Sequence, residues 1–71
     1  MRTIRDVREA RGWSVRETAA VIGVSFSDLA KIERGERTLS GENRVRLIRA
    51  FDLDPVQVRE IAEFAVTEVV A

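Results

Sequence analysis

The sequence predicts an all-α fold, a compact bundle of five short helices in a single domain that spans residues 1–71. The first observation is that apolar residues recur at helical spacing in five segments, which glycine, proline and serine residues separate. The second is that no segment alternates apolar and polar residues between turns, as a half-buried strand would. A hydrophobic fraction of 45% is typical of globular proteins. A chain of this length buries only about 60% of its unfolded surface, so we expect a thin core.

The first two expected helices span residues 3–11 and 15–22. The first has apolar residues three positions apart and a glycine stop signal after it: Ile4, Val7, Ala10 and Gly12. Ser14 is placed to cap the second helix, and Glu17, three residues further on, completes the pattern of a capping box.

A third helix is expected over residues 26–34, with Ser25 as its cap and Asp28 at the acidic position of a capping box. The turn before it is about three residues long and contains Gly23, which sends the third helix off at a steep angle from the second. One face of the third helix is thereby left to solvent or to a partner: Phe26, Ser27, Ala30, Lys31 and Arg34.

Two further helices complete the expected bundle. The fourth covers residues 41–51 after the cap Ser40, with a buried face that is expected to contain Val45, Leu47, Ile48 and Phe51. The fifth begins at Pro55, after the acidic cap Asp54, and is expected to run to about Val69.

The composition argues against several classes of protein. The chain has no cysteine and no histidine, which removes the thiolate and imidazole ligands and the commonest neutral-pH base. We find no nucleophile–base pair, phosphate-binding glycine loop or metal constellation, so no enzymatic activity, cofactor, metal or small-molecule site is expected. No apolar run approaches ~18 residues, and the N-terminus has no signal-peptide core. We therefore expect a soluble, cytoplasmic protein without a membrane partner.

The charges are balanced overall but not along the chain. There are 12 basic and 12 acidic residues, which gives a net charge of zero. Residues 1–37 contain eight basic and six acidic residues, whereas residues 38–71 contain four and six. The N-terminal half is therefore the better place for a polyanion. On charge alone, a solvated surface of salt bridges is the simpler interpretation.

Residues spread over most of the chain follow a known pattern. The segments VREARG, SVRETAAVIGV and KIERG contain the matching residues Arg8, Gly12, Ser14, Ala19, Gly23, Val24, Ile32, Glu33, Arg34 and Gly35. The segment LIRAFDLDPVQV follows them and continues the pattern. From residue 4 to about 58 the chain resembles, without a gap, the lambda-repressor-like (Cro/Xre-type) helix-turn-helix family. The resemblance implies a five-helix bundle with the helix-turn-helix at its second and third helices, and binding to double-stranded DNA. It also implies an ion pair between Arg8 and Glu33 that ties the third helix to the scaffold.

The resemblance places base-reading residues at Phe26, Ser27 and Lys31. Phe26 can make only apolar contacts, for which the thymine methyl group is the target in the major groove, whereas Lys31 can donate to guanine. Two other interpretations of Phe26 stay open, because the ring could pack under a neighbouring helix or anchor a protein contact.

Phosphate contacts are expected from Arg34 and Arg37 near the end of the third helix, from Arg16 on the second, and from the helix start at Ser25. Each arginine could equally be an ordinary exposed residue. Val15 departs from the family, which usually has a glutamine there that reaches a phosphate.

The C-terminal extension, residues 59–71, is interpreted as a dimerisation helix. A helix that is apolar on more than one face needs a second surface to cover it, and a twofold homodimer supplies one. The residues expected at that interface are Ile61, Phe64, Ala65 and Val69. The alternative is a tail packed back on its own core.

The sequence thus favours a transcriptional regulator, a repressor by preference, that binds an inverted-repeat operator as a homodimer. The alternative is a protein-interaction module on the same fold, such as an antitoxin or a phage or plasmid accessory factor, with weak or no DNA binding. Zero net charge, Val15 and Asp28 favour this alternative, whereas the arginine placement favours the regulator.

Overall fold

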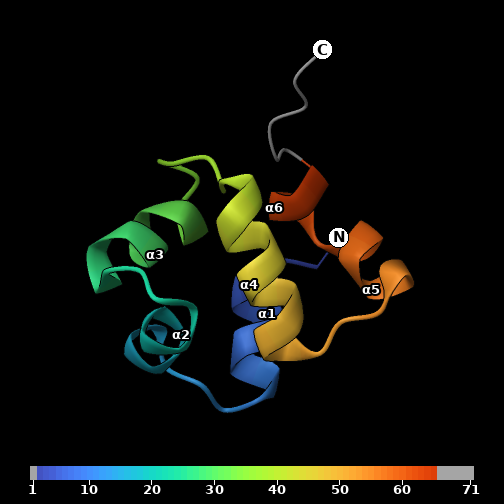
Figure 1. Cartoon of the computed structure of the whole chain (residues 1–71), viewed down its shortest axis with the longest axis horizontal. Coiled ribbons are helices and arrows are strands. Elements are labelled where there is room, and N and C mark those ends of the chain that lie inside the picture. The colour runs from blue at the N-terminus through green and yellow to red at the C-terminus, as the bar shows by residue number, and fades with distance from the viewer. Residues whose placement is uncertain (1, 66–71) are drawn as a thin grey trace.

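The computed structural model describes residues 2–65 and is all-helical over that range, as predicted. Its helices are α1 (Ile4–Ala10), α2 (Val15–Ile22), α3 (Phe26–Glu33), α4 (Gly41–Phe51), α5 (Pro55–Glu60) and α6 (Ala62–Ala65). Figure 1 shows α4 crossing the middle of the molecule with α1 behind it. The helix pair α2 and α3 lies on one side of α4, and α5 and α6 lie on the other.

Side-chain caps fix where the helices begin. The predicted box at α2 is present, because the Ser14 hydroxyl accepts from the Glu17 N–H at 3.0 Å and the Glu17 carboxylate accepts from the Ser14 N–H at 2.8 Å. Thr3 and Asp6 form a second box at α1, which sequence reasoning missed although the Thr-x-x-Asp spacing is visible. The predicted box at α3 is wrong in its second half. Ser25 does accept from the Asp28 N–H, but the Asp28 carboxylate accepts from Arg37 instead of returning to the cap.

The fifth helix is not continuous, which corrects the expectation of a single helix from Pro55 to about Val69. Ile61 has an extended backbone (φ −94°, ψ 121°) that separates α5 from α6. The N-terminal chain pairs with this break: the Arg2 N–H donates to the Glu60 carbonyl at 3.1 Å, and the Ala62 N–H donates to the Arg2 carbonyl at 2.8 Å. The break turns the Ile61 side chain into the core, where it is 1% exposed. Val69 lies outside the described residues.

The same C-terminal region also caps the first helix. The Glu63 carboxylate accepts a hydrogen bond of 2.8 Å from the Ile4 N–H, at the N-terminus of α1. A carboxylate is stabilising there because the first N–H groups of a helix have no partner within the helix and carry a partial positive charge. The two ends of the described chain are therefore joined by both backbone and side-chain hydrogen bonds.

One core lies between the helices, and all of them except α5 contribute a buried apolar residue. Its members are Ile4, Val7, Ala19, Ile22, Leu29, Ile32, Leu39, Leu47, Phe51, Ile61 and Phe64. Thr18 is fully buried as well, and its hydroxyl donates to the Ser14 carbonyl at 3.0 Å, so the polar atom is satisfied. Val45 was expected on the buried face of α4, but it is 43% exposed, so that expectation is wrong.

Candidate nucleic-acid interface

The turn between α2 and α3 depends on Gly23. This residue has a left-handed backbone (φ 76°, ψ 30°), which glycine adopts without a steric cost. The N–H groups of Gly23 and Val24 both donate to the Ala19 carbonyl, so the end of α2 is closed within two residues. Ser25 then starts α3 at once, which produces the short connection that the sequence predicted.

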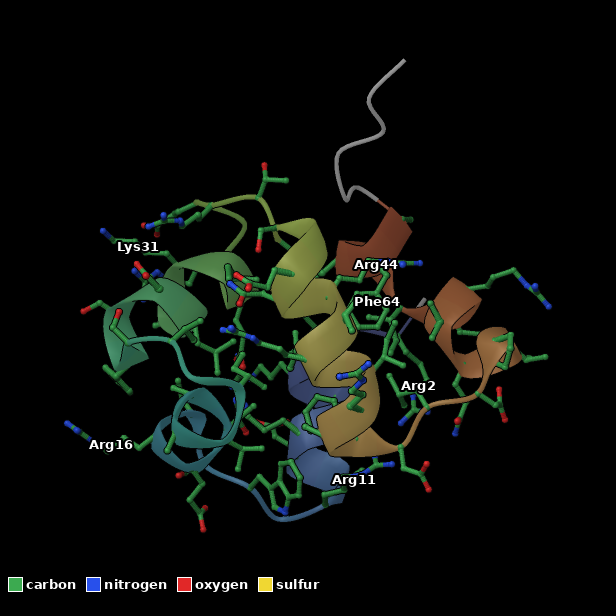
Figure 2. All side chains as sticks on the ribbon, in the orientation of Figure 1. Arg2, Arg11, Arg16, Lys31, Arg44 and Phe64 are labelled. Atoms are coloured by element: carbon green, nitrogen blue, oxygen red, sulfur yellow. The ribbon has the colours of Figure 1, made fainter. Side chains whose placement is uncertain are left out.

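The inner face of α3 fixes its rotation about its own axis. Leu29 is fully buried and Ile32 is 3% exposed, both within the core. Consequently the three residues predicted to read bases, Phe26, Ser27 and Lys31, are all exposed. Figure 2 shows Lys31 on α3 and Arg16 on α2 projecting outward from the same side of the bundle. The structure therefore brings the predicted base readers and one predicted phosphate residue to one surface.

Phe26 lies at the surface, not beneath a neighbouring helix. Its side chain is 44% exposed, and the Arg16 guanidinium lies 4.7 Å from the centre of its ring. This cation–π contact joins the start of α3 to the start of α2 and favours an outward position for both side chains. Val15, the neighbour of Arg16, is half-buried against the core.

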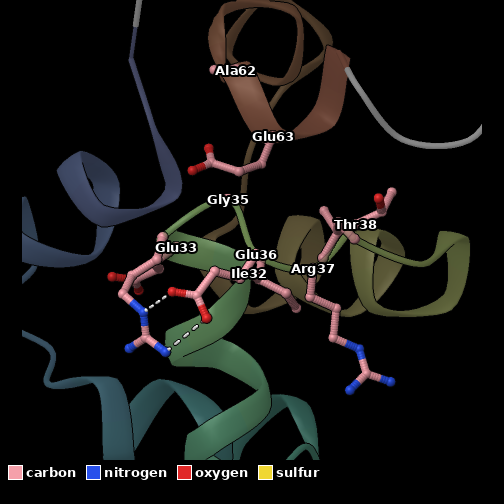
Figure 3. A pocket seen from close by; sticks show the side chains of 10 residues that line it. Ile32, Glu33, Gly35, Glu36, Arg37, Thr38, Ala62 and Glu63 are labelled. Carbon is pink, nitrogen blue, oxygen red and sulfur yellow. Dashed lines mark hydrogen bonds and ion pairs between the residues drawn. The ribbon is translucent and has the colours of Figure 1, made fainter.

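The other two arginines expected at phosphates have carboxylate partners. Arg34 makes a two-pronged contact with Glu36, with distances of 2.7 and 3.3 Å, which the dashed lines in Figure 3 mark. Arg37 reaches back to the first turn of α3, where its Nη1 lies 2.8 Å from Oδ1 of Asp28. The hydrogen bonds and charge of Arg34 lower the pKa of Glu36, so that carboxylate is ionised at neutral pH. Sequence reasoning missed both pairs.

The pair between Arg8 and Glu33, in contrast, is buried. Arg8 Nε lies 2.8 Å from Glu33 Oε2, and its Nη2 lies 3.0 Å from Oε1, while Nη1 donates to the Trp13 carbonyl at 2.8 Å. Both side chains are less than a tenth exposed. The hydrogen bond to Glu33 raises the pKa of the Arg8 guanidinium above its usual value. These contacts fasten α1, the loop before α2 and the end of α3 to one another.

A shallow hollow of about 390 Å³ lies between the loop after α3 and helix α6 (Figure 3). Its lining mixes apolar side chains such as Ile32 and Leu39 with charged ones such as Arg37 and Glu63. Among residues 2–65 no cluster of acidic residues has the arrangement of a metal site. No helix in that range is long and apolar enough to cross a membrane.

Two of the residues expected at a dimer interface, Ile61 and Phe64, lie in the core of the single chain instead. Ile61 and Phe64 are 1% and 5% exposed and belong to the core of the single chain, so neither side chain is free to contact a second copy. Arg44 on α4 covers the Phe64 ring, at 5.7 Å from its centre. Ala65 is exposed, and Val69 is not among the described residues. Of the residues expected at that interface, only Ile61 and Phe64 are seen to be covered by their own chain.

A small bundle in which a short turn joins two short helices, with the second exposing one face, defines the helix-turn-helix class. The family model described as helix-turn-helix matches residues 4–58. The chain belongs to this family, the Cro/C1-type helix-turn-helix proteins, which are DNA-binding transcriptional regulators. The resemblance drawn from the sequence is thereby confirmed.

Three relatives are similar to this chain over part of its length. The chain is 41% identical over 49 residues to a protein of Thermococcus kodakarensis named as a candidate HTH-type transcriptional regulatory protein. It is 37% identical over 49 residues to proteins of the same designation from Pyrococcus horikoshii and Pyrococcus abyssi. These alignments cover 69% of this chain but only 15 or 16% of the relatives, so the chain spans about a sixth of their length. No solved structure matches the chain significantly.

Proposed function

We propose that this chain binds double-stranded DNA with α3 in the major groove and acts as a transcriptional regulator. The observation that carries the proposal is the exposed face of α3, which presents Phe26, Ser27 and Lys31 opposite the buried Leu29 and Ile32. An α-helix fits the major groove, and in the helix-turn-helix architecture the first turns of the second helix contact base edges. The family supports this reading.

The three exposed side chains suggest how bases would be read. The Phe26 ring offers an apolar surface to a thymine methyl group, and the Lys31 ammonium can donate to O6 or N7 of guanine. Ser27 can pair with several bases and adds little discrimination. Because the buried ion pair of Arg8 and Glu33 holds the end of α3 at a fixed position, these side chains would enter the groove in a defined register.

Phosphate contacts would come from the residues that surround this face. Arg16 on α2 lies beside Phe26, while Arg34 and Arg37 follow the C-terminal end of α3. Ser25 contributes from the N-terminus of α3, where backbone N–H groups suit an anion. Such contacts supply affinity and orientation but no sequence information.

We further propose that two copies bind an inverted repeat and repress transcription by occupying the promoter. A pair of recognition helices one helical turn of DNA apart doubles the contacts of a single small module. With Ile61 and Phe64 in the core, Val56 and Ala65 are exposed apolar residues available to a second copy among the C-terminal residues that the structure describes.

A second candidate function is a protein-interaction module on the same fold. The observation in its favour is that Arg34 and Arg37 are both paired with carboxylates on the presumed DNA face, in a chain of zero net charge.

Selection of bound sequences from random duplex DNA distinguishes these functions. Enrichment of a palindromic sequence supports the homodimeric regulator, and a single enriched half-site supports a regulator that binds as a monomer. If no sequence is enriched over a library selected without protein, the DNA-binding proposal is contradicted and the interaction module takes its place.

A further inference from the structure

Two carboxylates lie on the surface that the proposed function assigns to DNA, and each holds an arginine expected at a phosphate. Asp28 is in the first turn of α3, and Glu36 follows its C-terminal end. We propose that Asp28 and Glu36 act as internal competitors of the DNA backbone and weaken binding to DNA of any sequence. This inference rests on the proposed DNA binding by α3.

The contacts show that the two carboxylates hold the arginines as a phosphate would. Arg37 Nη1 lies 2.8 Å from Asp28, although nine residues separate them in the chain. Arg34 presents both Nε and Nη2 to Glu36, in the two-pronged geometry that guanidinium groups also use with phosphate. Each carboxylate occupies part of the donors of its guanidinium and offsets its positive charge, so it competes with a phosphate for that arginine.

The exposure of these pairs makes the exchange feasible. The side chains of Arg34 and Glu36 are 56% and 55% exposed, and those of Arg37 and Asp28 are 57% and 38% exposed. Exposed ion pairs are weak, so a phosphate can displace the carboxylate from its arginine. The displaced carboxylate stays close to the DNA and repels it, which lowers the net gain of each contact.

We expect the two carboxylates to weaken mainly the sequence-independent part of DNA binding. That binding comes from the neutralisation of phosphates by cationic side chains, with release of counterions from the DNA. Phe26 and Ser27, which would read bases, have no part in either ion pair, and Lys31 acts on Glu36 only through its charge. A chain built in this way depends on its base contacts, and on a second copy, for stable residence on DNA.

The test compares the parent with Asp28→Asn, Glu36→Gln and the double variant. Each is titrated against a random-sequence duplex at several salt concentrations. Glu9→Gln is the matched control, because Glu9 forms a similar exposed pair with Arg5 on α1 at 3.1 Å and its substitution changes the net charge equally. Thermal melting followed by circular dichroism verifies that all variants fold as the parent does.

We expect Asp28→Asn and Glu36→Gln each to tighten binding about two- to fivefold, the range that corresponds to an exposed ion pair. Each should also steepen the salt dependence by up to about one unit of slope. The control Glu9→Gln should change both quantities by clearly less. If the three single variants behave alike, only the total charge matters and the inference is overturned, while DNA binding by the parent still stands.

Two further outcomes would contradict the inference. Weaker binding by Asp28→Asn would show that Asp28 makes a favourable contact with DNA, and this would remove it as a competitor. Absence of binding by the parent and by all variants would contradict both the inference and the proposed function. The double variant makes this outcome informative, because it frees Arg34 and Arg37 together.

Discussion

Carboxylates in α3 and in the loop after it form the same kind of ion pair in two different environments. At the C-terminal end of α3, Glu33 forms a buried, two-pronged ion pair with Arg8, and the Arg8 guanidinium also donates to the Trp13 carbonyl. Around the outer surface of α3, Asp28 and Glu36 meet Arg37 and Arg34 in contacts that are largely open to water. Burial makes the first pair costly to break, because a lone charge cannot be hydrated there, whereas water and salt readily replace a partner in the other two. The first pair therefore holds the helix, and the others are free to exchange.

The largest effect on the free energy of unfolding is expected when the buried pair of Arg8 and Glu33 is broken. Glu33→Ala leaves the Arg8 guanidinium buried without its carboxylate, and we expect the free energy of unfolding to fall by about 3 kcal/mol or more. Glu36→Ala removes an equally short contact at the surface and should leave the free energy of unfolding nearly unchanged, because water hydrates Arg34 there. Urea denaturation of both variants measures the difference. Equal losses would show that burial does not separate the two pairs.

The next effect concerns DNA binding by the exposed arginines. Changing Arg16, Arg34 or Arg37 to alanine should weaken binding to all DNA sequences to about the same extent. The salt slope should fall by roughly one unit for Arg16, and by up to about one unit for Arg34 and Arg37, whose charges Glu36 and Asp28 partly offset. The fold should keep nearly the stability of the parent, as is usual for surface substitutions. Titrations at several salt concentrations measure the slope. An unchanged slope in all three variants would exclude these arginines from the interface.

A smaller effect on stability is expected at Phe26. Because its ring is 44% exposed and contacts Arg16, Phe26→Ala should lower the free energy of unfolding by only about 1 kcal/mol. A loss of about 3 kcal/mol or more, as for a buried phenylalanine, would place the ring in the core. A variant that folds and binds DNA normally but no longer self-associates would place it in a protein interface.

The smallest effect is the dependence of stability on acid pH. Hydrogen bonds from the backbone and hydroxyl of Ser14 lower the pKa of Glu17 in the folded chain below its usual value of 4.5. A lowered pKa contributes stability that is fully present above about pH 4.5 and is lost as the pH falls through the folded value. Glu17→Gln keeps an acceptor for the Ser14 N–H but does not titrate, so its melting temperature should vary less with pH below 4.5. Parallel pH profiles for both proteins would contradict this assignment.

Much of the fold could be predicted from the sequence because its signals are local. Caps such as Ser14 and Ser25, the left-handed Gly23 and the helical spacing of apolar residues all act within one or two turns. The break at Ile61 could not be predicted in this way. It depends on pairing with the backbone of Arg2, and a backbone hydrogen bond leaves no mark on side-chain periodicity.

The candidate site likewise contains features that local sequence predicts and one that depends on a residue distant in the chain. The outward position of Phe26, Ser27 and Lys31 follows from the inward position of Leu29 and Ile32, which the sequence shows. The partner of the Asp28 carboxylate could not be predicted from the sequence, because the backbone at Ser25 and the side chain of Arg37 compete for it. The cap at Ser25 is adjacent in the chain, but Arg37 is brought close only by the loop after α3, which turns at the left-handed Gly35 (φ 77°).

The central claim is that the first turn of α3 reads bases in the major groove. The most direct measurement uses a selected DNA site in which the thymine opposite Phe26 is replaced by uracil, which removes only the methyl group. We expect the parent to bind the uracil site more weakly by ~1 kcal/mol, less than a good bidentate pair contributes. Phe26→Ala should bind the thymine and uracil sites equally. If the parent does not distinguish them at any thymine of the site, Phe26 makes no methyl contact and this account of the reading surface is contradicted.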